Sequence, residues 1–86
     1  MTFMKNKTIK IVKYYRSKDI AIITTLFSLG EKIDSIEKIN GECWFLMENE
    51  PKCLELERKY YSGELKIDPR NLFDSFKAIK SMIFSR

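Results

Sequence analysis

Between Ser17 and Gly30 the apolar residues leave almost no polar face on a helix, and this stretch limits the folds open to the chain. Its large apolar residues recur at helical spacing in two rows, so a helix here would be apolar on more than one side. Such a helix must be covered from several directions, and it is too short to span a bilayer. The sequence therefore predicts a buried central helix. The two rows are Ile20, Ile23 and Phe27, and Ile22, Leu26 and Leu29.

Signals at both ends support this helix. The Ser17 hydroxyl is suited to cap the first turn, and Asp19 lies where the helix dipole favours a negative charge. Gly30 can adopt the left-handed conformation that ends a helix. Thr24 and Thr25 are β-branched, as are the isoleucines, so a buried strand is the alternative interpretation.

The chain has 86 residues, of which 44 % are hydrophobic, with three glycines and two prolines. This composition is typical of one folded domain, so we expect a single domain over residues 1–86, with residues 1–7 less ordered than the rest. No window is long and apolar enough for a transmembrane helix, and no signal peptide is evident. We therefore expect a cytoplasmic protein with no membrane partner.

Other local signals complete the expected fold. Residues 8–15 mix β-branched, aromatic and lysine side chains, which is typical of an edge strand. Residues 32–39 and 42–48 flank Asn40-Gly41, the pair favoured in a two-residue hairpin turn. Pro51 and Pro69 mark the starts of two further helices, which end near residues 62 and 84, and residues 64–67 form a short strand or an extended link. The sequence thus predicts an α+β fold in which a small antiparallel sheet packs with three helices, in the order β-α-β-β-α-(β)-α.

The predicted hairpin has apolar residues on both faces. A two-residue turn pairs Ile39 with Glu42, and this register divides the side chains between the faces. Either helices cover both faces, or Trp44 lies exposed as a contact residue. One face carries Ile36, Cys43, Phe45 and Met47, and the other carries Ile33, Ile39, Trp44 and Leu46. In the last helix the residues expected to be buried are Leu72, Phe76, Ile79 and Ile83, with Phe73 beside them.

The sequence holds little of the equipment of an enzyme. It has no histidine, so neither a Ser-His-Asp triad nor a Cys-His pair can form. Two cysteines cannot by themselves build a structural zinc site, and we expect Cys43 and Cys53 to be reduced thiols that serve as small hydrophobic residues. We therefore predict a protein that is not an enzyme and that holds no metal or cofactor.

Positive charge is concentrated at the two ends of the sequence. The first 18 residues include six basic and no acidic residues, whereas residues 19–68 include eleven acidic and six basic ones. Cations interleaved with aromatic rings suit single-stranded nucleic acid, and the alternative is that the lysines only protect an edge strand. The candidate binding residues are Lys10, Lys13, Tyr14, Tyr15, Arg16, Lys18, Trp44, Lys77 and Lys80.

One segment also suggests a family. The run Tyr-Tyr-Ser-Gly-Glu-Leu-Lys-Ile-Asp-Pro-Arg over residues 60–70, which follows an apolar helix and a hairpin, resembles a family of small phage and bacterial proteins catalogued only as a domain of unknown function. The resemblance covers about residues 14–83 and implies no catalytic residue. It implies a phage or mobile-element context, and with it a role in host takeover or in blocking a bacterial defence system such as a CRISPR nuclease.

Two functional hypotheses follow. The first is stoichiometric binding to a host protein or nucleoprotein complex, which includes inhibition of a defence system. The alternative is direct binding of nucleic acid through the basic N-terminal strand and the lysines of the last helix. In addition, an edge strand at residues 8–15 could pair with a second copy of the chain to form a homo-oligomer.

Overall fold

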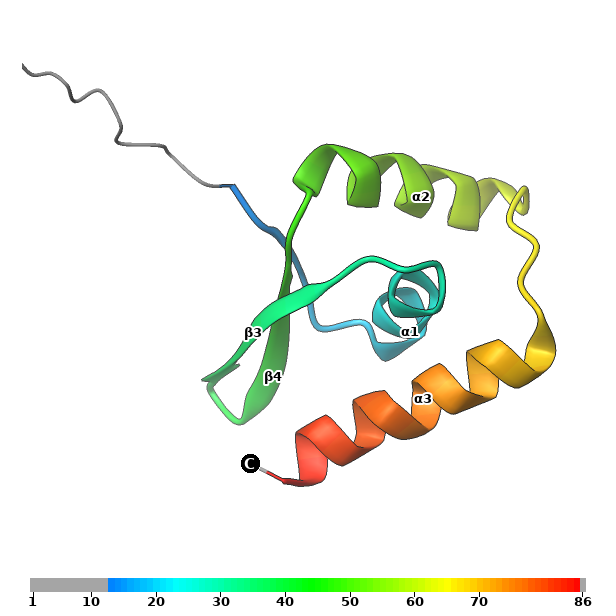
Figure 1. Cartoon of the computed structure of the whole chain (residues 1–86). Helices are drawn as coiled ribbons and strands as arrows, with labels where there is room; N and C mark the ends of the chain where they lie inside the picture. The colour runs from blue at the N-terminus through cyan, green and yellow to red at the C-terminus, as the bar shows by residue number, and fades with distance from the viewer. Residues whose placement is uncertain (1–12, 86) are drawn as a thin grey trace, which may run out of the picture.

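The computed structural model describes residues 13–85, which form an α+β fold with three helices and a three-stranded antiparallel sheet (Figure 1). The predicted fold class and order of elements are confirmed, and residues 64–67 link the last two helices without forming a strand. Most of the strand predicted at residues 8–15, and all of residues 1–7, lie outside the described residues. The elements are β2 (Tyr15–Ser17), α1 (Ile20–Ser28), β3 (Ile33–Ile39), β4 (Glu42–Met47), α2 (Glu50–Ser62) and α3 (Pro69–Phe84).

The sheet has β4 at its centre, with β2 and β3 antiparallel on either side. The hairpin turn between β3 and β4 is confirmed, because Asn40 and Gly41 have φ angles of 51° and 81°, both positive as a type I′ turn requires. The predicted register is also confirmed, with Ile39 opposite Glu42.

A β-bulge in β3 places Ile33 on the face opposite to the predicted one. Met47 lies opposite Ile33, yet Phe45 lies opposite Ile36, so three steps along β3 match two steps along β4. Ile33 therefore shares a face with Phe45 and Met47 and packs against the core. The prediction for Ile33 is wrong because strict alternation, on which it depended, is broken by the extra residue.

The ends of α1 are set by Asp19 and Gly30. The Asp19 carboxylate accepts hydrogen bonds from the backbone N–H groups of Ala21 (3.0 Å) and Ile22 (3.4 Å), so Asp19 is the N-cap. The prediction that Ser17 caps the helix is wrong, because Ser17 is still in β2 and its hydroxyl accepts from the N–H of Asp19. Gly30 has a φ of 99°, and its N–H donates to a carbonyl of the last turn, which confirms the predicted helix end.

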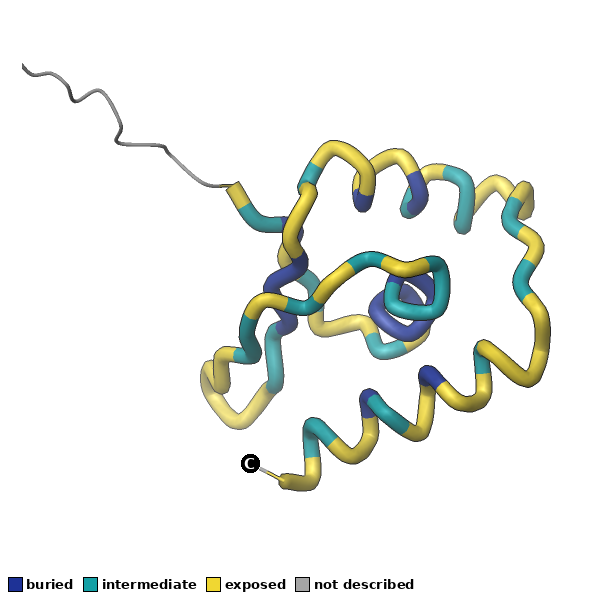
Figure 2. The backbone as a smooth tube through the Cα atoms, viewed as in Figure 1, coloured by how far each residue is buried: buried dark blue, intermediate teal, exposed yellow. Residues whose placement is uncertain are grey.

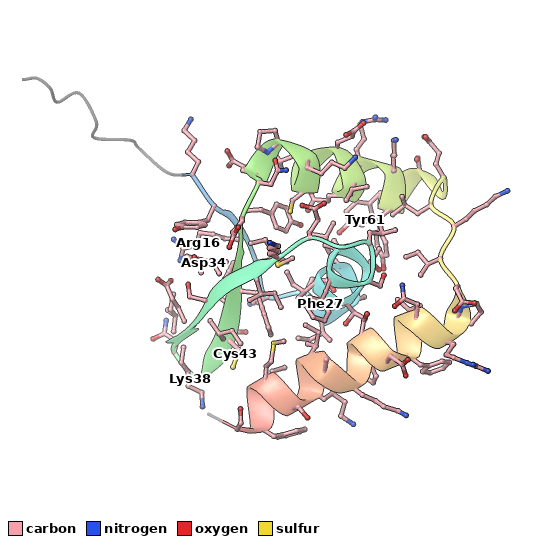
Figure 3. All side chains as sticks on the ribbon, viewed as in Figure 1. Arg16, Phe27, Asp34, Lys38, Cys43 and Tyr61 are labelled. Carbon is pink, nitrogen blue, oxygen red and sulfur yellow. The ribbon has the colours of Figure 1, made fainter. Side chains whose placement is uncertain are left out.

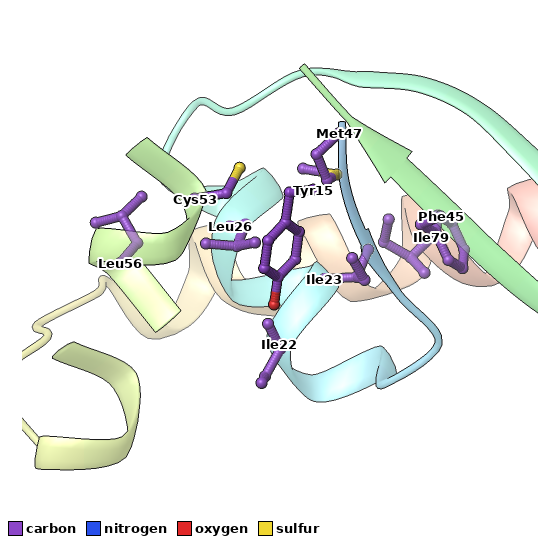
Figure 4. Packing of buried hydrophobic residues seen from close by; sticks show 9 residues of the cluster. All are labelled: Tyr15, Ile22, Ile23, Leu26, Phe45, Met47, Cys53, Leu56 and Ile79. Atoms are coloured by element: carbon purple, nitrogen blue, oxygen red, sulfur yellow. The ribbon is translucent and has the colours of Figure 1, made fainter. Parts of the chain in front are cut away.

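The central position predicted for α1 is confirmed, and the alternative of a buried strand is wrong. Figure 1 shows α2 and α3 on opposite sides of α1, with the sheet beside it, and α1 packs against both helices. Buried residues accordingly gather on α1 and on the sides of the other elements that face it (Figure 2). The buried cluster drawn in Figure 4 consists of Tyr15, Ile22, Ile23, Leu26, Phe45, Met47, Cys53, Leu56 and Ile79.

The last helix buries less apolar surface than predicted. Asp68 caps α3 by accepting from the N–H of Asn71 (3.1 Å), and Ile79 is fully buried as expected. Phe76 and Phe73, however, are 39 % and 66 % exposed. Among the elements of residues 13–85, α1 is the one against which α3 packs extensively, so these two rings lack a second element to cover them.

Tyr15 joins β2 to α2 through the core. Its side chain is 4 % exposed, and its hydroxyl donates a 2.8 Å hydrogen bond to Oε2 of Glu57 on α2. Burial, together with the hydrogen bond to the Glu57 carboxylate and its charge, raises the pKa of Tyr15 well above its ordinary value of about 10. The folded protein therefore holds the phenolic proton more tightly than the unfolded chain does.

Replacing Tyr15 by Phe tests this connection. We expect Tyr15→Phe to lower the free energy of unfolding by about 1 to 2 kcal/mol at neutral pH, because the Glu57 carboxylate loses its donor. The contribution of Tyr15 is fully present below pH about 10 and is lost above it, as the unfolded tyrosine ionises and the folded one does not. The free energy of unfolding, measured with urea, should therefore fall more between pH about 8 and pH about 11 in the wild type than in Tyr15→Phe. Equal losses would contradict the assignment, and Tyr61→Phe, at a 69 % exposed site, is the matched control.

Candidate functional site

Two of the predicted binding residues, Lys18 and Trp44, are in contact, and a third, Arg16, lies on the strand beside Trp44. The Nζ atom of Lys18 lies 5.7 Å from the centre of the half-buried Trp44 ring. It is also 2.8 Å from the Glu42 carboxylate, and the Arg16 guanidinium is 3.1 Å from the Glu37 carboxylate. The hairpin thus supplies one carboxylate for each of these two cations.

This pairing reduces what the surface offers to a nucleic acid. The four charged side chains are about half exposed, and exposed ion pairs contribute only about 0 to 1 kcal/mol, so a phosphate could replace a carboxylate. Glu37 and Glu42 would nevertheless stay beside that phosphate and repel it. The charges of Arg16 and Lys18 are therefore largely balanced by carboxylates of the hairpin.

The other predicted residues do not join this surface. Tyr15 lies in the core, so its ring is not available to a partner. Lys13 is exposed and Tyr14 is half-buried just before β2, while Lys10 lies outside the described residues. In Figure 3, Arg16 is seen at left, on the sheet, and Tyr61 at right, near the C-terminal end of α2.

Sequence reasoning missed an apolar groove where three helices meet. The groove has a volume of about 470 Å³, and α1, α2 and α3 all contribute to its lining. Because α1 lies between the other two helices, it forms the floor, and α2 and α3 form the walls. The lining residues are Ile20, Ala21, Thr24, Thr25, Tyr60, Leu72, Phe73 and Phe76.

The groove exists because the floor side chains are short. Ala21, Thr24 and Thr25 are spaced three and four residues apart and so share one face of α1, where longer side chains would fill the space between the walls. This spacing is visible in the sequence. It did not identify the groove, because it does not show how far apart the other two helices lie.

The α3 wall continues outward as an aromatic and basic surface. We call this surface the α3 rim, and it consists of Arg70, Phe73, Phe76, Lys77, Lys80 and Phe84. Phe73 and Phe84 are 66 % and 80 % exposed, and the Nζ atom of Lys80 lies 5.5 Å from the centre of the Phe76 ring. Within the described part of the chain, no cation of the α3 rim is within ion-pair distance of a carboxylate. Lys77 and Lys80 are thus brought together with exposed phenylalanines and not with Trp44.

The thiols behave as structural groups. Cys53 is fully buried, burial raises the pKa of its thiol to about 11, and Cys43 is half-buried. Both cysteines are unpaired. A thiol with such a pKa is protonated at neutral pH and is a poor nucleophile, so Cys53 serves as a small core residue.

No protein-family model, curated protein or solved structure matches this chain. Over residues 13–85, none of the helices has the length and apolarity needed to cross a membrane. In the same residues, no three His, Cys, Asp or Glu side chains lie together as metal ligands. The fold and the site define a small α+β protein with an apolar groove beside a basic helix face.

The floor of the groove contains a buried hydroxyl group whose replacement tests how the groove is packed. The Thr24 hydroxyl is shielded from solvent and has no hydrogen-bond partner in residues 13–85, whereas the Thr25 hydroxyl donates to the Ala21 carbonyl at 2.8 Å. We expect Thr24→Val to raise the free energy of unfolding by about 1 kcal/mol, because an unsatisfied buried group is removed with little change of shape. The matched Thr25→Val should lower it by about 0.5 to 1.5 kcal/mol. Urea unfolding measures both, and similar losses in the two variants would show that Thr24 has a partner in solution.

Proposed function

We propose that this protein acts by stoichiometric binding to another protein, and that it binds through the groove and the α3 rim. The observation that carries this proposal is the exposure of Phe73, Phe76 and Phe84 along one helix beside a concave apolar groove. Single exposed apolar side chains are ordinary, but several gathered on one helix beside an apolar groove mark an interaction site in a small protein.

A host protein or a host nucleoprotein complex is the proposed partner. The resemblance of residues 14–83 to small phage and bacterial proteins supports this choice, and a bacterial defence complex such as a CRISPR nuclease belongs to the proposed class. The proposed action is inhibition by occupancy and not catalysis. A chain with no histidine cannot form a Ser-His-Asp triad or a Cys-His pair, which supports a binding role.

Direct nucleic-acid binding is the second candidate. Lys77 and Lys80 favour it, because they are exposed, and no carboxylate of residues 13–85 pairs with them. The pairing of Arg16 with Glu37 and of Lys18 with Glu42 speaks against it at the sheet. The two candidates differ in salt dependence. A protein that neutralises about four phosphates loses affinity with a log-log slope of about −3 to −4, whereas an apolar interface depends little on salt.

Affinity capture of the tagged full chain from a bacterial lysate, with and without nuclease, tests the proposal. We expect a protein retained in stoichiometric amount after nuclease treatment and after washing at high salt. We also expect Phe73→Ser to lose it, because this aromatic side chain would be a main contact. The control is Tyr61→Ser, which removes an equally exposed aromatic ring that lies outside the groove lining.

Loss of all retained protein with the nucleic acid would contradict the proposal. In that case two charge-reversed double variants would show which cations hold the nucleic acid. One is Arg16→Glu with Lys18→Glu, and the other is Lys77→Glu with Lys80→Glu. If both double variants still retain the nucleic acid, neither set of cations is what holds it.

A further inference from the structure

We propose that the groove and the α3 rim receive an acidic amphipathic helix of the partner protein. Its apolar side chains would enter the groove, and its carboxylates would meet Arg70, Lys77 and Lys80. The inference rests on the proposed function and names the chemistry of the partner segment.

The groove requires an occupant with protruding apolar side chains. Its floor and walls come from three helices, and the few polar atoms there include the Thr24 hydroxyl, which solvent does not reach. An extended peptide would find no free strand edge in this lining for its backbone N–H and C=O groups. A helix satisfies its own backbone and presents side chains at i, i+3, i+4 and i+7, which is the usual mode of recognition in an apolar groove.

Charge complementarity makes the occupant acidic. Along α3, Arg70, Lys77 and Lys80 are accompanied by a single acidic residue, Asp74. Lys77 follows Phe73, and Lys80 follows Phe76, each by four residues, so cations and phenylalanines lie next to one another on the helix surface. The acid nearest the groove on α1 is Asp19, whose carboxylate is held by the backbone amides of the first turn. A basic partner segment would therefore be repelled at the α3 rim and an acidic one attracted.

Three other occupants fit less well. A planar bilayer could reach Phe73 and Phe84 but not the floor of a concave groove. A nucleic acid would find few polar groups in the lining with which to pair. A second copy of the chain would have to supply an acidic helix. Its α2 exposes the apolar side chains of Leu54 and Tyr61 but carries three acidic and three basic residues, and its α3 is basic.

Selection from displayed helical peptides tests the inference on the full chain. The library keeps apolar residues at i, i+3, i+4 and i+7 and draws the remaining positions from Glu, Lys, Gln and Ser. We expect selected peptides to be enriched in Glu over Lys. A synthesised selected peptide should bind at least about tenfold more weakly to Phe73→Ser, and to the pair Lys77→Glu and Lys80→Glu, than to the wild type.

Exchange of charge provides the sharpest readout. A peptide in which Lys replaces the selected Glu residues should recover binding to the Lys77→Glu, Lys80→Glu variant and lose binding to the wild type. The matched controls are Tyr61→Ser and the pair Lys38→Glu and Lys66→Glu, which change exposed residues outside the groove lining and should leave binding unchanged. Circular dichroism of each variant confirms that it is folded.

Several results would overturn the inference. These are the absence of any selected peptide, enrichment of neutral or basic peptides, or binding that Phe73→Ser does not weaken. Cosedimentation with anionic phosphatidylglycerol vesicles, binding of a single-stranded oligonucleotide, or a dimer that Phe73→Ser dissociates would assign the groove to another occupant. If lysate capture still retains a protein after nuclease while peptide selection fails, the proposed function stands and the acidic helix falls. If capture retains no protein, the function itself falls.

Discussion

The burial of α1 is the constraint on which the rest of the structure depends. Isoleucine and threonine lower the intrinsic stability of this nine-residue helix, so it is helical only because its neighbours remove its side chains from water. Ile22, Ile23 and Leu26 are at most 2 % exposed, and they are reached from β2, α2 and α3. α2 and α3 lie on opposite sides of α1, so α3 is not held in place by α2. Its position is set by packing on α1 and by a hydrogen bond that the Asn71 side-chain amide donates to the Ser28 carbonyl (2.9 Å).

Most features determined by two or three adjacent residues could be predicted from the sequence, although the N-cap of α1 is Asp19 and not Ser17. Asn40-Gly41 fixes the hairpin because both residues tolerate positive φ, and Asp68-Pro69 starts α3 because one residue caps and the other needs no hydrogen bond. Features determined by packing could not. The bulge in β3 turns Ile33 toward the core, where it packs against buried residues of other elements. Phe73 is exposed because no element of residues 13–85 other than α1 packs extensively against α3.

In the candidate site, too, the features that depend on packing could not be predicted from the sequence. Proximity of Lys18 and Trp44, with Arg16 on the neighbouring strand, follows from β2 and β4 being adjacent, and the sequence alone did not place Trp44 beside these cations. Arg16 and Lys18 are paired with Glu37 and Glu42, which come from a distant part of the sequence. A count of charge along the chain does not reveal such pairs. Groups of opposite charge that are far apart in sequence become partners across a sheet, so the positive charges of Arg16 and Lys18 are balanced by carboxylates of the hairpin.

Exposed phenylalanines on α3 carry a risk of self-association, and the lysines between them limit that risk. Two copies that met through the α3 rim would bring Lys77 and Lys80 of one copy against those of the other, and this repulsion is strongest when the rings are in contact and water is excluded. A partner with carboxylates at the matching positions meets attraction in place of repulsion. Because the opposite side of α3 is anchored on α1, the rim is already helical before it binds, and no folding cost reduces the affinity. The same residues thus disfavour self-association and favour the acidic partner proposed above.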